Sequence, residues 1–568
     1  MALLRKNGYG AKLAFVVLLL LFAAGLRIPG ITYGQPDPAY FPSYARNQTL
    51  SPNSAFHPDE FHQVSKPLQM LLRRQLHPQF FENPNFLINL NFVTYWLTNA
   101  EDGLTLADRE NIDGTDQDIG AREYAPFRLY VQTRYFSALG GLLAVAGAFA
   151  LGKQLSGHPF GGAIAGLLTA VSLPMVQHAH YATTSSLAAG FAAVSAWAAL
   201  ATLRENQGQR GLLVLSGIMA GLAAGCRYNA AAVSLVLFFV GCVLLYRNPS
   251  RAMLRQVLLG WLLFPVSFVL TTPYLLRDPA MFLHDFQYIS NQYVADGATG
   301  VSKWVGLFYE YRYLVVFGVG IPATVLGVLG VAIAFFRPRV SRQGNSTALP
   351  MLLLLGFIVP YSYVVLRTVR PNMAEQMLVP IIPVFAALSG LGAVQLRTWL
   401  PGPAQVRGGL IAAAIVAMPL VYTLPALQLF HTDTRDLMTA WITEHVPPGT
   451  TIHLNGSYNV ALDPAYFPQT QNYYGSYPTP EELRASGVDL VLLSDALLYD
   501  DLLNPLITPS QKEFIRDYLA LWDNLPVLAR VERPVWPGSD QFMNSMRIWH
   551  SPTLTLYCLD EAACAAMR

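Results

Sequence analysis

The stretch Leu13-Ala-Phe-Val-Val-Leu-Leu-Leu-Leu-Phe-Ala-Ala-Gly-Leu26 decides the fold class, because it is a run of apolar residues without a single charge. Arg5, Lys6 and Lys12 precede it, as they would precede a secretory signal. Arg27-Ile-Pro-Gly30 follows directly, however, and no small-x-small cleavage site leads into a soluble domain. We therefore predict an uncleaved membrane anchor whose N-terminus lies in the cytoplasm.

Further apolar runs of similar length recur along the chain of 568 residues, which is 53% hydrophobic and 13% charged. Soluble globular chains carry roughly 25% charged residues, so the composition excludes disorder, a coiled coil and an ordinary soluble enzyme. A bilayer core of about 30 Å is spanned by about 20 apolar residues in a helix. The sequence predicts a mainly α polytopic membrane protein with eleven spans, near 13–26, 128–151, 159–177, 184–203, 211–226, 229–246, 256–273, 313–335, 348–366, 376–395 and 408–427.

Charge is segregated along the chain although its net value is only +2. If the spans alternate from a cytoplasmic N-terminus, the cytoplasmic links hold fourteen Lys and Arg residues against one acid, Glu205, as the positive-inside rule requires. Residues 30–126 and 431–568 are acidic, and this threading places both outside the cytoplasm. Acidic blocks do not attract nucleic acid, so we expect none as a partner, and we expect a multi-pass protein of the plasma (inner) membrane.

Two domains are predicted: a transmembrane domain over residues 1–428 and an extracytoplasmic α/β domain over 429–568. Within the long outer loop 30–126, apolar spacing predicts a helix over Pro58–Leu76, kinked at Pro67, and a second over Phe86–Leu97. In the C-terminal domain, the sequence predicts helices over Asp433–Val446, after a capping box at Thr479–Glu482, and after a cap at Ser510–Glu513, with strands over Thr451–Leu454, Val488–Leu493, Val527–Glu532 and Thr553–Leu559. Whether Cys558 and Cys564 pair stays open.

The motif His57-Pro-Asp-Glu-Phe-His62 is the strongest local candidate for chemistry. A proline at the first helical position and two acids in the first turn also suit a plain helix N-terminus. A carboxylate between two imidazoles at the outer membrane face could, alternatively, take a proton from an incoming hydroxyl.

Four arginines lie at the outer face, where the positive-inside rule disfavours them: Arg134, Arg227, Arg367 and Arg370. Each could snorkel to the lipid headgroups. Together, on the face that carries Asp59, they favour an anion site, because guanidinium groups match phosphate geometry. His178, His180 and Tyr181 are expected in the outer loop between the third and fourth spans, where a divalent metal site remains an alternative to satisfied histidines.

The order and topology of several pieces resemble the polyprenyl-phosphate-dependent membrane glycosyltransferases of the GT-C fold, which include the protein mannosyltransferase and aminoarabinose transferase families. The pieces are His57-Pro-Asp-Glu60, Arg134, Gly221-Leu-Ala-Ala-Gly-Cys-Arg-Tyr228, Thr272-Pro-Tyr274, Leu378-Val-Pro-Ile-Ile-Pro383 and Thr434-Arg-Asp436. The resemblance implies transfer of a sugar from a polyprenyl-phosphate carrier to a hydroxyl of a lipid, glycan or protein acceptor, with inversion if a single displacement occurs.

The resemblance also implies roles for individual residues. Asp59 would be the base, with Glu60 and His62 shaping the catalytic pocket. The lipid phosphate and the sugar would be held by Arg134, Arg227, Tyr228, Arg367, Arg370, His57, His180 and Tyr274. No metal ligand is assigned, and divalent metal dependence stays open.

This chain departs from the family pattern at two places. Ser185 stands where many members carry an aspartate, and Gln376-Met377 stands where an Arg-Tyr pair is common.

A transporter or lipid flippase is the alternative from another class of protein function. Such proteins place ionisable groups near the bilayer midplane and often show repeats, whereas here the ionisable groups gather at the outer face.

Overall fold

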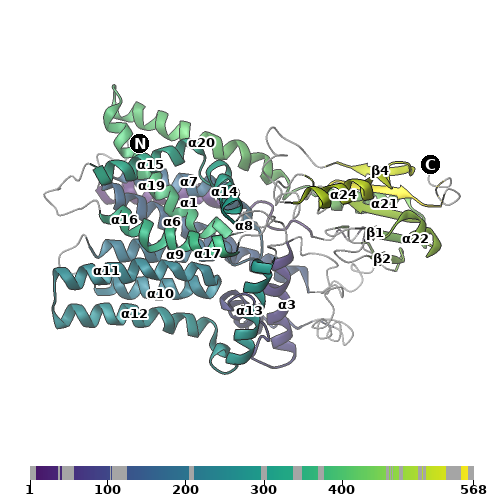
Figure 1. Ribbon diagram of the computed structural model, residues 1–568, viewed down its shortest axis with the longest axis horizontal. Coiled ribbons are helices and arrows are strands. Elements are labelled where there is room, and N and C mark those ends of the chain that lie inside the picture. The colour runs from purple at the N-terminus through teal and green to yellow at the C-terminus, as the bar shows by residue number, and fades with distance from the viewer. Residues whose placement is uncertain are drawn as a thin grey trace.

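The computed structural model describes residues 8–35, 37, 39–40, 57–102, 104, 125–203, 210–295, 303–336, 348–368, 377–455, 459–460, 462–463, 465–471, 477–496, 502, 507–532, 552–560 and 564. Most of these residues are helical, and a small sheet lies near the C-terminus. In Figure 1 the long helices run side by side, and the sheet domain sits at the end of this bundle where α3 (Pro58–Leu72) and α13 (Pro279–Ala295) lie. This end is therefore the outer end of the bundle in the threading predicted above.

The bundle is built from α1 (Gly8–Gly25), α6 (Phe127–Ser156), α7 (Pro159–Val171), α8 (Leu173–His180), α9 (Ser185–Ala201), α10 (Arg210–Cys226), α11 (Ser234–Arg247), α12 (Arg251–Thr271), α14 (Lys303–Tyr313), α15 (Ile321–Phe336), α16 (Ala348–Leu353), α17 (Val359–Thr368), α19 (Ile382–Trp399) and α20 (Ala404–Gln428). Short 3₁₀ turns precede α11, α13 and α19 at η3 (Tyr228–Val233), η4 (Pro273–Leu275) and η8 (Val379–Ile381). In the described part, five helices are long and apolar enough to cross a membrane, or seven if each bent pair is one span. The remaining predicted spans fall on shorter apolar helices, so the count of eleven stays a prediction.

The core of the bundle lies between α6, α7, α9 and α19. Small residues let these helices approach closely. A Cβ added at Gly140 of α6 would lie 2.6 Å from the backbone nitrogen of Leu187, and one added at Gly190 of α9 would lie 2.7 Å from the carbonyl oxygen of Gly140. Glycine at both positions therefore sets the spacing of α6 and α9, as small residues do between membrane helices.

The third predicted span is broken, because α7 and α8 meet at Ser172 with a bend of 53°. Pro174 stands at the start of α8 and cannot continue the hydrogen bonding of α7. The buried Arg27 guanidinium donates to the freed carbonyls of Thr169 and Ala170 at 3.1 and 2.9 Å. His178 and His180, which we expected in a loop, lie in α8. That expectation was wrong because the helix resumes after the proline.

Two helices of the long outer segment pack against each other: α3 (Pro58–Leu72) and α4 (Phe86–Leu97). Leu87 of α4 also belongs to the bundle core. The bounds of α4 agree with the prediction, whereas α3 ends four residues earlier than predicted, before Arg74 adopts a left-handed φ of 53°. Pro67 lies inside α3 and removes the donor for the carbonyl of Gln63. The side-chain amide of Asn91 on α4 donates to that carbonyl at 2.8 Å, so the proline is accommodated without breaking the helix.

The C-terminal domain contains a five-stranded sheet in the order β2-β1-β3-β5-β4, formed by β1 (Ile452–Asn455), β2 (Gln469–Gln471), β3 (Leu490–Ser494), β4 (Val527–Val531) and β5 (Leu554–Cys558). β1 is parallel to β2 and β3, and β5 is antiparallel to β3 and β4. Its helices are α21 (Thr434–His445), α22 (Pro480–Ala485) and α24 (Pro509–Ala520). β2 was not predicted. The cap of α24 is Thr508 with Gln511 rather than Ser510 with Glu513, because Pro509 takes the first helical position and the cap residue precedes it.

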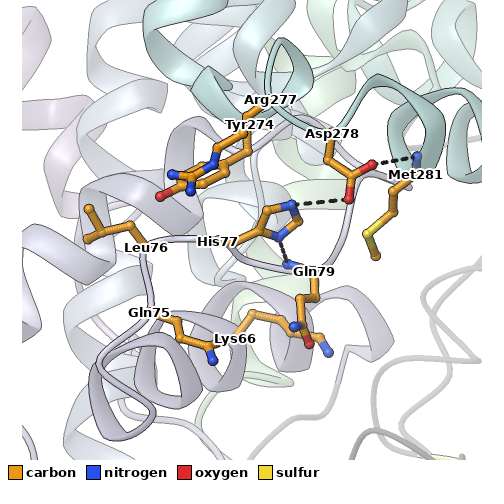
Figure 2. Close-up of a pocket in the computed structure, with 9 residues that line it drawn as sticks. All are labelled: Lys66, Gln75, Leu76, His77, Gln79, Tyr274, Arg277, Asp278 and Met281. Atoms are coloured by element: carbon orange, nitrogen blue, oxygen red, sulfur yellow. Dashed lines mark hydrogen bonds and ion pairs between the residues drawn. The ribbon is translucent and has the colours of Figure 1, made fainter.

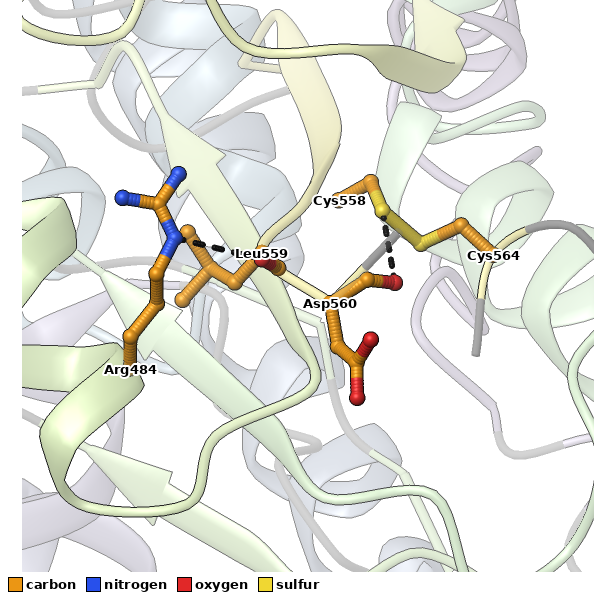
Figure 3. The surroundings of a disulfide bond; sticks show 5 residues. All are labelled: Arg484, Cys558, Leu559, Asp560 and Cys564. Carbon is orange, nitrogen blue, oxygen red and sulfur yellow. Dashed lines mark hydrogen bonds between the residues drawn. A yellow bond between two sulfur atoms is a disulfide. The ribbon is translucent and has the colours of Figure 1, made fainter. Parts of the chain in front are cut away.

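Cys558 and Cys564 form a disulfide after the last strand (Figure 3). Near them, the Nε of Arg484 in α22 donates to the carbonyl of Leu559 at 3.2 Å. The disulfide closes a short loop at the end of β5, and the Arg484 bond joins this loop to α22. The pairing left open by the sequence is present in the structure.

Candidate active site

The first turn of α3 is organised by a capping box. His57 caps the helix with an extended backbone, and its Nδ1 accepts a hydrogen bond from the backbone nitrogen of Asp59 at 3.1 Å. In return, the Glu60 carboxylate accepts from the backbone nitrogen of His57 at 3.4 Å. Pro58 fits the first helical position, and acids suit the positive end of the helix dipole. The motif is thus a helix start that also fixes where its carboxylates point.

Glu60 is completely buried and paired with Arg134 of α6. Its Oε1 lies 2.8 Å from the Nε of Arg134, and its Oε2 lies 3.2 Å from Nη2. The same carboxylate accepts from the backbone nitrogen of Ala182 at 2.8 Å and from the Tyr33 hydroxyl at 3.2 Å. Glu60 therefore ties α3 to α6, to the segment after α1 and to the entry of α9.

Arg134, predicted as a phosphate ligand, points instead into this buried network. Its Nη1 donates to the carbonyls of Ile31 and Tyr33 at 3.1 and 2.8 Å, and its guanidinium lies 3.9 Å from the centre of the Tyr33 ring. The side chain is fully buried, so this geometry gives it a structural partner rather than access to a lipid phosphate. Asp59, in contrast, is only half-buried and is the carboxylate of the motif that remains accessible.

Histidines line the buried side of the site. The His57 ring lies 4.6 Å from the Tyr181 ring and 6.0 Å from the His178 ring. Neither ring nitrogen of His178 has a hydrogen-bond partner within the described protein, although the side chain is fully buried. Burial lowers the pKa of His57 despite the nearby charges of Asp59 and Glu60, which favours a neutral imidazole at neutral pH. His178 is a residue that the site prediction omitted.

His180, predicted to bind substrate, is held by backbone carbonyls. Its Nδ1 lies 2.9 Å from the carbonyl oxygen of Val176 and its Nε2 lies 2.9 Å from that of Pro29. Its ring stacks on Phe430 with 4.1 Å between ring centres. Because His180 is fully buried among these partners, its position is that of a packing residue between α8 and the segment that leads to the C-terminal domain.

Arg227 lies between the buried residues around His57 and a cavity. It precedes η3 in an extended conformation, and its Nη1 donates to the Ser185 hydroxyl at 2.5 Å. Its positive charge also contributes to lowering the pKa of His57, so the guanidinium lies within electrostatic reach of the capping box. Ser185, which stands where relatives often carry an aspartate, is thus a direct partner of Arg227.

The cavity beside Arg227 has a volume of about 400 Å³ and is mostly apolar. Its walls come from the segment after α3, from η3, from α13 (Pro279–Ala295), from α17 and from Met377. Tyr228, predicted to bind substrate, belongs to this wall, and its hydroxyl donates to the carbonyl of Phe81 at 2.8 Å. An apolar hollow with a guanidinium at its edge suits a ligand with a hydrocarbon chain and an anionic head.

Glu82 is an acid that lines this cavity, and sequence reasoning missed it. Burial and the neighbouring Asp285 raise its pKa, whereas Lys66 acts in the opposite direction. The negative charge of Asp59 also raises the pKa of Glu82, so the two carboxylates are close enough to interact electrostatically. Nothing in the sequence around Glu82 distinguishes it from the other acids of the outer loop, since its place depends on how the segment after α3 returns towards α13.

The remaining predicted residues are separate from this cluster or lie outside the description. Arg367 belongs to the last turn of α17, but its side chain, like the whole of Arg370, lies outside the described residues. Tyr274 lines a different pocket (Figure 2), which shares no lining residue with the cavity beside Arg227. The His62 ring stacks on Phe80 with 4.6 Å between ring centres. Among described residues, no three His, Cys, Asp or Glu side chains cluster as metal ligands would.

Comparison with known proteins gives one family match. The model of the dolichyl-phosphate-mannose-protein mannosyltransferase family matches residues 110–288, which is less than half of the chain. No curated protein matches the sequence significantly.

Solved structures of similar architecture include the oligosaccharyltransferase AglB from Archaeoglobus fulgidus in complex with an inhibitory peptide and a dolichol-phosphate (11% identity, 89% of this chain, 72% of that chain, TM-score 0.47). Another is ArnT from Cupriavidus metallidurans bound to undecaprenyl phosphate (15% identity, 97% of this chain, 99% of that chain, TM-score 0.39). These TM-scores are below 0.5, so we draw no function from them.

The matched residues 110–288 contain α6 to α12 and Arg134, Ser185 and Arg227, which are part of the region described above. The match confirms the resemblance found in the sequence. The chain is a multi-pass membrane protein that resembles the polyprenyl-phosphate-dependent glycosyltransferases of the GT-C fold.

Proposed function

We propose that the protein is an integral membrane glycosyltransferase that moves a sugar from a polyprenyl-phosphate carrier to an acceptor hydroxyl at the outer membrane face. The observation that carries the proposal is the position of Arg227. Its guanidinium lies at the edge of an apolar cavity, bonds to Ser185 and is within electrostatic reach of His57. The cavity would receive the first isoprene units, and Arg227 would bind the phosphate.

Asp59 is the base in this mechanism. Its carboxylate takes the proton of the acceptor hydroxyl while the acceptor oxygen bonds to the anomeric carbon. The bond from that carbon to the phosphate oxygen breaks, and the lipid phosphate leaves with the bonding electrons. Arg227 stabilises the charge that develops on this phosphate. A single displacement of this kind inverts the anomeric carbon.

Glu60 and Arg134 serve this mechanism indirectly, because their pair fixes the first turn of α3 and thereby the position of Asp59. Glu82 is the carboxylate that we assign to the place left by Ser185, since it faces the same cavity as Arg227 and interacts with Asp59.

We also propose that the N-terminus is cytoplasmic and that the C-terminal domain, with residues 429–568, lies outside the inner membrane. The basic cytoplasmic links of the predicted threading support this orientation. The disulfide between Cys558 and Cys564 supports it independently, because disulfides persist in oxidising compartments.

The test uses purified protein and a panel of polyprenyl-phosphate sugars with a detected transfer product. Asp59→Asn should lower turnover by at least about a hundredfold, whereas Asp517→Asn, at an exposed position of α24, should leave turnover unchanged. Full activity of Asp59→Asn would show that the motif over residues 57–62 only starts a helix and has no catalytic role.

Donor affinity gives a second readout. Arg227→Gln should weaken binding of a polyprenyl phosphate about tenfold to a hundredfold, and Arg227→Lys should restore it only in part, because lysine lacks the planar fork. Equal affinity of all three proteins would remove the phosphate site. Transbilayer movement of the lipid without any transfer product would favour the flippase alternative instead.

A further inference from the structure

A second pocket, with a volume of about 670 Å³, opens beside the far end of α3. Figure 2 shows its walls. One wall comes from α3 and the turn that follows it, and the other from η4 and the start of α13. The lining residues are Lys66, Gln75, Leu76, His77, Gln79, Tyr274, Arg277, Asp278 and Met281. The mechanism proposed above uses none of them.

Several contacts hold the shape of this pocket. The Nε2 of His77 lies 3.6 Å from Oδ2 of Asp278, and the Nδ1 of His77 accepts from the backbone nitrogen of Gln79 at 2.9 Å. The other oxygen of Asp278 accepts from the backbone nitrogen of Met281 at 3.0 Å. His77 therefore joins the two walls, with α3 and its following turn on one side and α13 on the other.

The chemistry of the lining is polar, aromatic and positive. The ring of Tyr274 lies 4.7 Å from the His77 ring and 5.9 Å from the Arg277 guanidinium. Gln75 and Gln79 provide side-chain amides, which can both donate and accept hydrogen bonds. Among the lining residues Lys66 and Arg277 are cationic, and Asp278 alone carries a carboxylate. That carboxylate lies near the His77 ring and accepts a hydrogen bond from the backbone of Met281.

We propose that this pocket binds an acidic saccharide, a sugar that carries a phosphate or carboxylate group, as part of the acceptor. Amides and an aromatic ring suit the hydroxyls and the apolar face of a sugar ring, and the two cations suit its anionic group. A neutral hydrocarbon would match neither the charges nor the side-chain amides of this lining. The proposal rests on the proposed transferase function, since it names the acceptor class for that reaction.

The position of the pocket relative to Asp59 supports this assignment. Lys66 follows Asp59 by seven residues on α3, so a rise of 1.5 Å per residue separates them by about 10 Å along the helix. The charges of Asp59 and Lys66 both affect the pKa of His62 and the pKa of Glu82. A saccharide bound at Lys66 and Arg277 would therefore lie about two helical turns from the base along nearly the same face of α3, and a further hydroxyl of the acceptor could reach the base.

The test measures binding of glucose 6-phosphate, glucuronate, glucose, glycerol 3-phosphate and inorganic phosphate to the full chain in detergent by calorimetry. We expect saturable binding of the two acidic sugars, at least about tenfold weaker in Lys66→Gln and in Arg277→Gln. Tyr274→Ala should weaken the binding of glucose 6-phosphate more than the binding of inorganic phosphate. The matched controls are Arg516→Gln on α24 and Tyr288→Ala on α13, both exposed and outside the pocket, and they should bind as the unchanged protein does.

Other outcomes overturn the proposal. Equal affinity for glucose 6-phosphate, glycerol 3-phosphate and inorganic phosphate would show a general anion or lipid-headgroup site. Unchanged affinity in all three pocket variants, or no binding of either acidic sugar, would remove the site. The polyprenyl-phosphate affinity of Arg227→Gln separates this failure from that of the transferase. If Arg227→Gln lowers the donor affinity while the pocket variants bind acidic sugars as the unchanged protein does, the transferase function is supported and only the acceptor pocket is rejected.

Discussion

Asp59 and Glu60 are neighbours of the same charge, yet the protein gives them different environments. Asp59 is half-buried at the first turn of α3, whereas Glu60 is fully buried and bonded to Arg134, Ala182 and Tyr33. The sequence identified the pair as a candidate for chemistry, which stays a prediction, but it could not show which carboxylate is enclosed. That depends on contacts with residues far along the chain, and no local pattern reports them.

Glu60→Gln should destabilise the protein, because it leaves the Arg134 charge buried without its counterion. Removal of one partner from a buried ion pair costs about 3–5 kcal/mol. Denaturant unfolding in mixed detergent micelles measures the change. Glu513→Gln, at an exposed position of α24, is the control and should be nearly neutral. An equally small effect of Glu60→Gln would contradict the structural role assigned to the pair.

We expect the buried His62 to make the stability of the protein depend on pH. Burial lowers its pKa to about 4, against an ordinary value of 6.5. Between these pH values the unfolded chain binds the proton and the folded chain does not, so stability falls as the pH falls from about 6.5 towards about 4, by up to about 1.4 kcal/mol per pH unit. His62→Phe keeps the ring stack on Phe80 and should flatten this dependence. His284→Phe, at an exposed residue of α13, should leave it unchanged, and parallel curves for all three proteins would exclude His62 as the cause.

At the scale of elements, the sequence predicted helices best where apolar periodicity was long and uninterrupted. The bounds of α4 agree with the prediction, and every predicted span falls on an apolar helix or a bent pair. Errors arose at prolines. α8 includes Pro174 and α24 starts at Pro509, whereas α3 continues through Pro67 as predicted. In each case a tertiary contact or a cap residue decides whether a helix starts, ends or continues at the proline. The spacing of apolar residues reports neither.

The bond between Asn91 and Gln63 provides a test of this explanation for α3. Asn91→Leu should cost about 1–3 kcal/mol, because the carbonyl of Gln63 then stays buried without a donor. Pro67→Ala restores the backbone donor to that carbonyl. In the Pro67→Ala background the cost of Asn91→Leu should therefore shrink, and a double-mutant cycle on unfolding free energies measures the difference. Additive effects would show that the amide of Asn91 does not compensate for the proline.

At the scale of the whole molecule, the two domains meet at a segment whose role the sequence did not reveal. Phe430 follows α20 and precedes α21. It is buried between the ring of His180 at 4.1 Å and the ring of Tyr33 at 5.2 Å. Gly30, with a φ of +81°, lies so close that an added Cβ would be 2.8 Å from the Cβ of Phe430. Tyr33 in turn bonds to Glu60, so the domain junction packs directly on the network behind the proposed base.

Phe430→Ala should loosen this junction, because truncation of a buried phenylalanine costs about 3–5 kcal/mol when the cavity does not collapse. Limited proteolysis of the detergent-solubilised protein should then release the C-terminal domain faster than from the unchanged protein. Gly30→Ala should act in the same direction, since it strains a left-handed backbone and collides with Phe430. Phe514→Ala removes a half-exposed ring on α24 and should leave the cleavage rate unchanged. If Phe430→Ala released the domain no faster than Phe514→Ala, the junction would be held by other contacts, and the ring would only fill space.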